Sequence, residues 1–128
     1  MTNPFDRTRM APRERFAGAE QAFRLSDEFA NLPAQSTPRQ GHMQKALYRH
    51  GPVTTAIFEF QKDGHINQHA IEGESILHVL EGRVIVHTPT SEYDLGPNDL
   101  LLIDPAVPHD IRAAERSRLL MTVVLMGT

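Results

Sequence analysis

Histidine and carboxylate side chains are the groups in this sequence with the most evident chemical potential. Seven histidines occur in 128 residues. His65 and His69 precede Glu72 and Glu74 closely, and His109 lies in a second, proline-rich stretch. Imidazole and carboxylate groups can bind a divalent metal, exchange protons near neutral pH or hydrogen-bond a small ligand. A metal site and a polar binding pocket are therefore the first chemistries to consider.

Other catalytic patterns are weak. Ser75 could be imagined as a nucleophile beside a histidine and a glutamate, but no nucleophile-elbow pattern surrounds it. No glycine-rich phosphate loop of either common pattern occurs. The chain has no cysteine, which excludes disulfides, zinc ribbons and thiol nucleophiles. Whether the protein is an enzyme stays open at this point.

The composition is that of one ordinary globular domain. The 128 residues are 40% hydrophobic and 23% charged, enough for one core and too few for two. The formal net charge of −3 provides no basic footprint, so we expect no nucleic-acid partner. The longest apolar run, residues 119–126, falls short of the about 20 residues that a membrane helix needs, and residues 1–7 carry no signal-peptide core. We therefore expect a cytoplasmic protein that does not enter a membrane.

The chain changes character at Gly41. Proline, arginine and glutamine concentrate before it, and we expect residues 1–40 to be a partly helical N-terminal extension that packs on the main domain. Its first dozen residues are expected to be loosely ordered. Ser26 is expected to cap a short helical turn that carries Phe29 and Leu32 on one side.

Residues 41–128 are predicted to form a series of short strands. Short apolar runs alternate with turn residues, which is typical of an antiparallel sandwich or barrel. Residues 75–80 and 100–103 are apolar at both parities, so both faces of these strands should be covered. The extension is one candidate cover and a second copy of the chain is another, and we expect a homodimer. The apolar runs are residues 43–48, 53–60, 75–80, 84–87, 100–103, 109–112 and 119–126.

Two stretches resemble the two motifs of the cupin superfamily. Residues 64–82 end in Val-Leu-Glu-Gly, similar to the strand and turn that close the first motif. Residues 95–109 contain Gly-Pro-Asn-Asp and Pro-Ala-Val-Pro-His, similar to the start and end of the second. The resemblance implies an all-β fold, a cupin-like jelly-roll antiparallel β-barrel. Glu81 and Gly82 would then form a tight hairpin turn in which glycine allows a positive φ.

The metal-binding pattern of that superfamily is only half present. Metal-binding cupins take two histidines and a glutamate from the first motif and one further histidine from the second. By this resemblance, His69 and His109 match two of the four ligand positions, and Ile71 and Ser75 replace the other two. Two imidazoles alone bind a metal weakly, so a complete site would need other ligands.

Neighbouring side chains could supply them. Glu74 or Glu72, with His69 and His109, would form a two-histidine, one-carboxylate site for Fe, Mn, Ni or Zn. His65, at a turn, could be a third imidazole. In the alternative interpretation, both glutamates are solvated loop charges and the histidines line a pocket that hydrogen-bonds a small molecule.

Strand periodicity predicts which other residues face that pocket. In the family register Leu77 faces the barrel interior, and His78 lies on the outer face. Ser75 shares the inward parity, so Ser75 and Leu77 are expected to line the ligand pocket with the two motif histidines. The remaining histidines lie at predicted strand ends and are expected at the surface: His42, His50 and His87.

Three functions are consistent with these features. We favour binding of a small molecule around His69 and His109. The alternative is a metal-dependent enzyme of dioxygenase, isomerase or decarboxylase type, whose metal would activate oxygen or polarise a carbonyl. The third is a partner-binding protein that uses the apolar outer face around Ile76, His78 and Leu80.

Overall fold

The computed structural model of the chain describes residues 20–32, 41–69 and 72–125, except for the side chains of Gln68 and His69. This part of the chain contains one short helix and nine strands. No helix within it is long and apolar enough to cross a membrane. The elements are α1 (Leu25–Ala30), β1 (His42–His50), β2 (Val53–Phe60), β3 (His65–His69), β4 (Gly73–Glu81), β5 (Val84–His87), β6 (Glu92–Leu95), β7 (Leu100–Ile103), β8 (His109–Ala113) and β9 (Ser117–Leu125).

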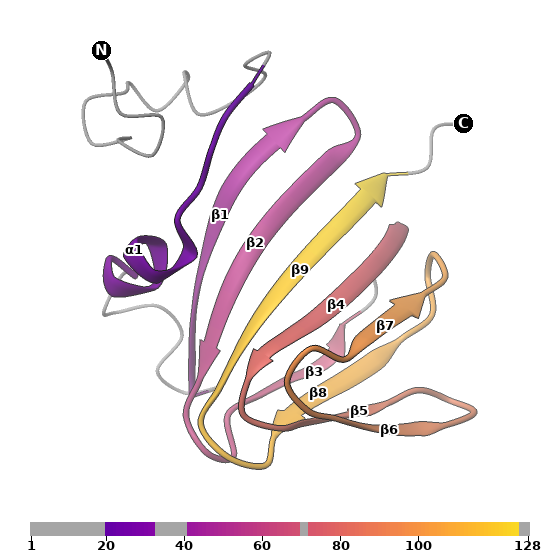
Figure 1. Cartoon of the computed structure of the whole chain (residues 1–128). Coiled ribbons are helices and arrows are strands. Elements are labelled where there is room, and N and C mark those ends of the chain that lie inside the picture. The colour runs from indigo at the N-terminus through magenta and orange to yellow at the C-terminus, as the bar shows by residue number, and fades with distance from the viewer. Residues whose placement is uncertain (1–19, 33–40, 70–71, 126–128) are drawn as a thin grey trace.

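The strands form two antiparallel sheets that face each other (Figure 1). The first sheet has the order β1-β2-β9-β4-β7, and the second has the order β3-β8-β5-β6. Strands that are neighbours in a sheet are therefore often distant in sequence, as in a jelly roll. The predicted all-β fold is confirmed.

Inward-facing side chains of both sheets share one core. On β4, Ser75, Leu77 and Val79 are buried, whereas Ile76 and His78 between them are half-buried on the opposite face. This alternation confirms the predicted register, in which Leu77 faces inward and His78 outward. The second sheet contributes Val84, Val86, Ile111 and Ala113 to the same core.

Helix α1 covers part of the outer face of the five-stranded sheet. Phe29 is buried against Leu47 and Ile57, and the guanidinium of Arg118 lies 4.7 Å from the centre of the Phe29 ring. No side-chain hydrogen bond caps the N-terminus of α1, where Arg24 is the N-cap residue. Ser26 lies inside the helix, so the predicted Ser26 cap is wrong. Packing therefore holds this helix, since six residues would not be stable alone.

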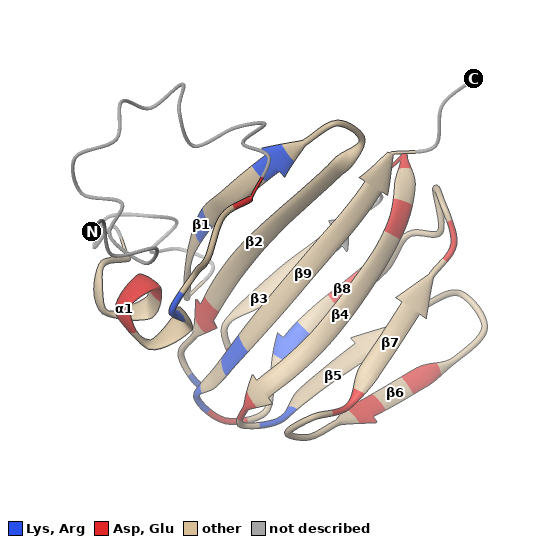
Figure 2. Ribbon diagram, turned by 45° about the horizontal axis from the view of Figure 1, so that its top comes forward, with Lys and Arg blue, Asp and Glu red and all other residues tan. Residues whose placement is uncertain are grey.

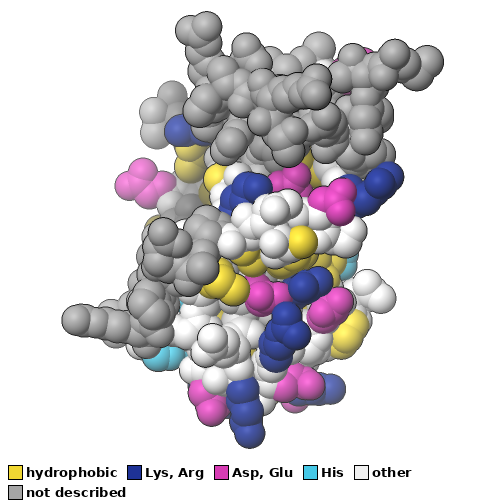
Figure 3. All heavy atoms as spheres, turned by 90° about the vertical axis from the view of Figure 1, so that its left-hand side faces the viewer, with side chains coloured by type: hydrophobic (Ala, Val, Ile, Leu, Met, Phe, Trp, Pro, Cys, Tyr) yellow, Lys and Arg dark blue, Asp and Glu magenta, His cyan; other side chains and the backbone are white. Residues whose placement is uncertain are grey.

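An ion pair lies beside the apolar contact between α1 and the sheet. Nζ of Lys45 donates a hydrogen bond of 2.9 Å to the carboxylate of Glu28. On this side of the molecule, acidic and basic side chains lie interspersed around the visible hydrophobic ones (Figure 3). Residues 1–19 and 33–40, which were predicted to belong to the same extension, lie outside the described residues.

The described chain does not cover the outer face of residues 100–103, so cover by a second copy stays a prediction. Leu100 is 64% exposed and Leu102 is 58% exposed, whereas Ile103 is buried in the core. Strand β7 is at one edge of its sheet. Helix α1 packs on the outer face of the same sheet near the opposite edge. One face of this strand therefore meets solvent.

A corner at Gly82 takes the chain from one sheet to the other. Strands β4 and β5 lie in different sheets, so the predicted hairpin at Glu81 and Gly82 is wrong, although the predicted positive φ is confirmed at +84°. A Cβ at position 82 would collide with the carbonyl oxygen of Arg116 and lie 2.7 Å from Cα of Ser117. Only glycine fits both the backbone conformation and this close approach.

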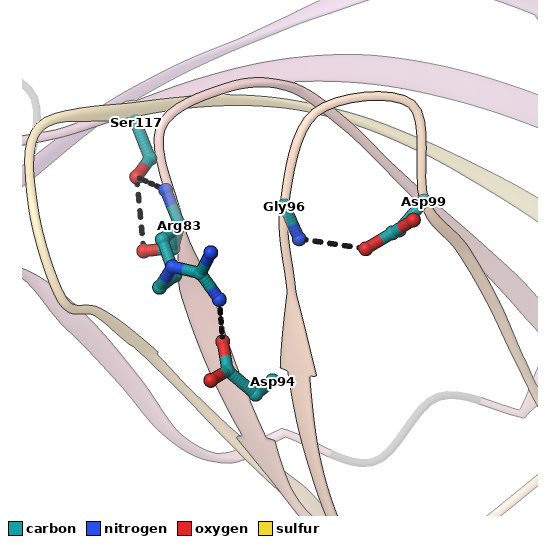
Figure 4. A network of polar contacts seen from close by, with 5 residues as sticks. All are labelled: Arg83, Asp94, Gly96, Asp99 and Ser117. Carbon is teal, nitrogen blue, oxygen red and sulfur yellow. Dashed lines mark hydrogen bonds and ion pairs between the residues drawn. The ribbon is translucent and has the colours of Figure 1, made fainter.

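Hydrogen bonds of Ser117 hold this corner (Figure 4). Its fully buried hydroxyl accepts a hydrogen bond of 3.0 Å from the backbone N–H of Arg83 and lies 2.7 Å from the carbonyl oxygen of Glu115, to which it can donate. The guanidinium of Arg83 lies outside the corner and donates to Asp94 at 2.6 Å. That hydrogen bond and the negative charge of Asp94 raise the pKa of Arg83.

A second corner, between β6 and β7, returns the chain to the first sheet. The carboxylate of Asp99 accepts a hydrogen bond of 2.8 Å from the backbone N–H of Gly96, and Asn98 has a φ of +69° (Figure 4). Backbone hydrogen bonds join this turn to Val79 on β4. The turn predicted at residues 96–99 is confirmed.

We expect Gly82→Ala to lower the free energy of unfolding by about 2–4 kcal/mol, because left-handed strain adds to a steric clash. The measurement is urea denaturation. Gly51→Ala is the matched control: its φ is +57°, and nothing lies within 4 Å of its added Cβ. This control should lose only about 1 kcal/mol. Equal losses in the two variants would contradict the crowded corner.

Ser117→Ala should lower the free energy of unfolding by about 1–3 kcal/mol, because it removes a buried acceptor from the N–H of Arg83. Asp94→Asn removes the charge of the exposed ion pair and should cause no resolvable loss. Thermal and urea unfolding of both variants would test this. A larger loss in Asp94→Asn would mean that the ion pair, and not Ser117, holds the corner.

Candidate functional site

The two motif histidines come from neighbouring strands. In the pairing of β3 with β8, His69 is the register partner of His109, although 40 positions separate them in sequence. An irregularity between Ile66 and His69 shifts the register just before this point. The side chain of His69 lies outside the described residues, as does Ile71, so the backbone alone places His69 beside His109.

His109 is a buried histidine with a defined ring orientation. It is 2% exposed, on the inward face of β8 with Ile111. Its Nδ1 lies 3.0 Å from the carbonyl oxygen of Val107, and because a carbonyl only accepts, Nδ1 carries the proton. In the neutral ring, Nε2 then has the lone pair that can accept a hydrogen bond or bind a metal.

The loop before β8 sets this orientation. Val107 donates a backbone hydrogen bond of 3.3 Å to Asp104, and Ala106 has a φ of +64°. Pro105 and Pro108 flank this turn and restrict the backbone on either side of it. The predicted aim of His109 toward the barrel interior agrees with its burial.

A cavity of about 440 Å³ adjoins His109 at one end of the four-stranded sheet. It lies between the end of β5, the loop that follows β5 and the start of β8. His87 on β5 and Asp110 on β8 are register partners, so the sheet brings them side by side. The described residues that line the cavity are His87, Thr88, Pro89, Pro108, His109 and Asp110.

The loop that forms one wall is held by its own hydrogen bonds. The backbone N–H of Thr88 donates to the carbonyl of Ser91 at 2.9 Å, and the Thr88 hydroxyl accepts from the N–H of Ser91 at 3.1 Å. Next to it, Nε2 of His87 lies 2.5 Å from a carboxylate oxygen of Glu92, with both side chains more than half exposed. The cavity therefore combines one buried imidazole with a polar, solvent-facing rim.

Two predicted pocket residues lie elsewhere in the interior. Ser75 is 1% exposed and Leu77 is fully buried, but neither is among the described residues that line the cavity. Leu77 packs in the core between the sheets. The predicted inward orientation of both residues is confirmed, whereas their expected place in this pocket's wall is not.

The predicted carboxylate ligands are not among the described residues that line the cavity at His109. Glu74 has the parity of Ile76 and His78, on the face opposite to the core, and Glu72 is exposed. Among the described residues, no three His, Asp or Glu side chains are grouped so that they could hold a metal ion. The predicted metal site includes the side chain of His69, which lies outside the described residues, so this site stays a prediction.

The other histidines were expected at turns and at the surface, and only some of them lie there. His65 is at the opposite end of β3 from His69, roughly 13 Å along the strand, so it is not a third imidazole of this site. His50 is exposed as predicted. His42, predicted at the surface, is 4% exposed, and its ring centre lies 5.4 Å from that of Phe60.

Sequence reasoning missed most of the cavity wall. His87 was predicted only as a surface histidine, and Thr88, Pro89 and Asp110 were not singled out. The one available signal was the proximity of Asp110 to His109 in sequence. The pairing of β5 with β8 is a long-range property that no local pattern indicates.

Comparison with solved structures places the fold among cupins. A cupin superfamily protein from Desulfitobacterium hafniense DCB-2 has a TM-score of 0.69 at 18% identity, over 86% of this chain and 95% of that chain. KdgF from Halomonas sp. has a TM-score of 0.68 at 16% identity, over 79% and 93% of the two chains. An RmlC-like cupin from Shewanella frigidimarina NCIMB 400 has a TM-score of 0.63 at 20% identity, over 68% and 78%. At these identities the likeness concerns the fold alone.

Comparison of sequences identifies the family. No curated protein matches the chain. The family model of the AraC-like ligand binding domain matches residues 50–127, which includes β2 to β9 and the cavity at His109. Because this match extends over more than half of the chain, the chain belongs to the family of AraC-like ligand-binding domains, and its fold is that of the cupins.

Proposed function

We propose that this protein binds a small polar molecule in the cavity beside His109. The observation that carries the proposal is the position of His109 itself, a buried imidazole with a fixed ring in the wall of a cavity. A volume of about 440 Å³ lies within the range of small-molecule sites. Membership of a ligand-binding family supports the same assignment.

The lining favours a ligand with hydrogen-bond donors. His109 lies on the inward face of β8, and in the tautomer set by Val107 its buried Nε2 has the acceptor lone pair. The carboxylate of Asp110 is also an acceptor, and His87 adds a second imidazole at the rim. Pro89 and Pro108 provide apolar surface between them. A molecule with hydroxyl or amine groups on a compact apolar frame would match this lining.

Metal-dependent catalysis, the alternative function, would need further ligands besides the two motif histidines. His109 is the one predicted histidine ligand whose side chain is described, Glu74 has the outward parity of β4, and Glu72 is exposed. A metal site that includes His69 stays a prediction. Binding in the cavity requires none of these groups as metal ligands, because the polar side chains of the wall can hydrogen-bond a ligand directly.

Screening a library of small polar fragments by NMR should reveal compounds that shift the backbone amide signals of His87, Thr88, His109 and Asp110, because these residues line the cavity. For the best fragment, His109→Ala should weaken binding by about tenfold or more, the effect of one buried hydrogen bond. Asp110→Asn provides a second test should His109→Ala fold poorly.

His50→Ala is the matched control, since it removes an exposed imidazole outside the cavity wall, and it should leave the affinity unchanged. The titrations are repeated with EDTA. Binding that disappears with EDTA would contradict metal-free recognition, and signal shifts confined to other regions would contradict this cavity as the site.

A further inference from the structure

One end of the outer face of the four-stranded sheet forms part of the cavity wall. His87 is exposed on β5 and Asp110 is half-buried on β8, and both have the parity opposite to the core. His87 is the register partner of Asp110 on one side and of Glu92 on the other. A carboxylate of β8, an imidazole of β5 and a carboxylate of β6 therefore lie in one row across the sheet.

The polar hydrogens of the wall's side chains are directed to acceptors within the protein. Nε2 of His87 lies 2.5 Å from a carboxylate oxygen of Glu92, and because two lone pairs would repel each other at this distance, Nε2 carries a proton. The Thr88 hydroxyl donates to the carbonyl of Ser91 at 3.4 Å, and Nδ1 of His109 donates to the loop before β8. For a bound molecule these side chains therefore leave mainly lone pairs.

The groups that remain for a ligand are hydrogen-bond acceptors. In the neutral ring of His87, Nδ1 holds the lone pair. The carboxylate of Asp110 has about four lone-pair sites, so it can accept from a ligand even where the protein contacts it. Pro89 and Pro108 have neither an N–H group nor a polar side chain. The side chains of the described wall thus match hydrogen-bond donors and not acceptors.

The formal charge around the cavity is negative. Asp110 contributes a carboxylate, and the described residues of the wall include no lysine or arginine. Strand β6, which carries Glu92 beside His87, is marked by its acidic residues (Figure 2). On β8, Arg112 is two positions from Asp110, and its guanidinium lies 3.7 Å from a carboxylate oxygen of Asp63. An anionic ligand would therefore meet acceptors and charge of its own sign.

We propose that the ligand of this cavity is a cation, a small molecule that carries a primary ammonium group. This inference rests on the proposed binding in the cavity and adds the charge of the ligand. An ammonium group has three N–H donors and no acceptor, so it matches a wall of acceptors. A hydroxyl group can use the same acceptors, but it does not compensate the negative charge of Asp110.

The prolines and the volume define the rest of the ligand. Pro89 follows Thr88 in the loop after β5, and Pro108 precedes His109. Their rings provide apolar surface in the wall. The volume of about 440 Å³ is in the lower part of the range of small-molecule sites. An amine on one compact aliphatic ring therefore suits this cavity.

The test is an NMR titration of the full chain near neutral pH with cyclohexylmethylamine, cyclohexylmethanol and cyclohexanecarboxylate, which share one ring. The amide signals of His87, Thr88, His109 and Asp110 report on the cavity. The amine, which is protonated at this pH, should bind at least about tenfold more tightly than the alcohol, because its hydrogen bond to the carboxylate is also an ion pair. The carboxylate probe should leave these signals unshifted.

Asp110→Asn removes the charge at nearly constant volume. It should weaken binding of the amine at least about tenfold and binding of the alcohol less than about threefold. Asp94→Asn is the matched control, because it removes a carboxylate from the same sheet face, where Asp94 pairs with Arg83 outside the cavity wall. It should leave the affinity for the amine within about twofold, since salt screens a distant exposed charge.

Equal binding of the amine and the alcohol at the cavity signals would overturn the ammonium assignment and leave binding in the cavity intact. Equal losses in Asp110→Asn and Asp94→Asn would also overturn it. An amine that shifts none of the cavity signals would do the same, and the fragment library then decides separately whether the cavity binds a small molecule. The comparison of amine with alcohol uses the unaltered chain, so it holds even if Asp110→Asn folds poorly.

Discussion

The close approach of Gly82 to the backbone of Arg116 and Ser117 is the contact on which the arrangement of the site depends. It lets the chain leave β4 and enter the opposite sheet without a wider loop. Strand β5 then begins at a set position and pairs with β8, so that Val84 lies opposite Ala113 and His87 opposite Asp110. Since sheet register is periodic in two residues, a slip at the corner would reverse the faces of β5. The cavity wall is thus a consequence of a corner at the other end of the strand.

The second half of the wall depends on the turn before β8. Pro105 and Pro108 restrict the chain, and the Val107 carbonyl fixes which nitrogen of His109 carries the proton. Metal-binding histidines are oriented by the same kind of hydrogen bond at their second ring nitrogen. Glu74 faces away because it is one residue from the inward parity that Ser75 occupies. A difference of one position along a strand decides which face a carboxylate reaches.

The alternation of side chains along a strand also decides which residues reach the outer face of the five-stranded sheet. Alternate residues of β4 face the core and the outer face, and the outward ones include the apolar Ile76 and Leu80 as well as Glu74 and His78. Helix α1 covers the end of the face that carries Leu47 and Ile57, where Glu28 and Lys45 form the polar margin. Toward β7 no described element of the chain takes that place, and the leucines there are exposed.

The sequence by itself determined the fold class, the two cupin-like motifs and three strands to the residue: Val53–Phe60, Val84–His87 and Leu100–Ile103. These strands are runs of apolar residues between turn residues, so local chemistry marks them. Strands β3 and β6 escaped prediction because they are mostly polar, and backbone pairing with β8 and β5 makes them strands.

Tertiary structure alone decided what the corner at Gly82 joins, where Glu74 faces and which residues form the cavity wall beside His109. These features depend on contacts between segments distant in sequence, such as β5 with β8 and Gly82 with Ser117. Hydrophobic pattern predicts that a residue is buried, but long-range pairing selects the residue it is buried beside.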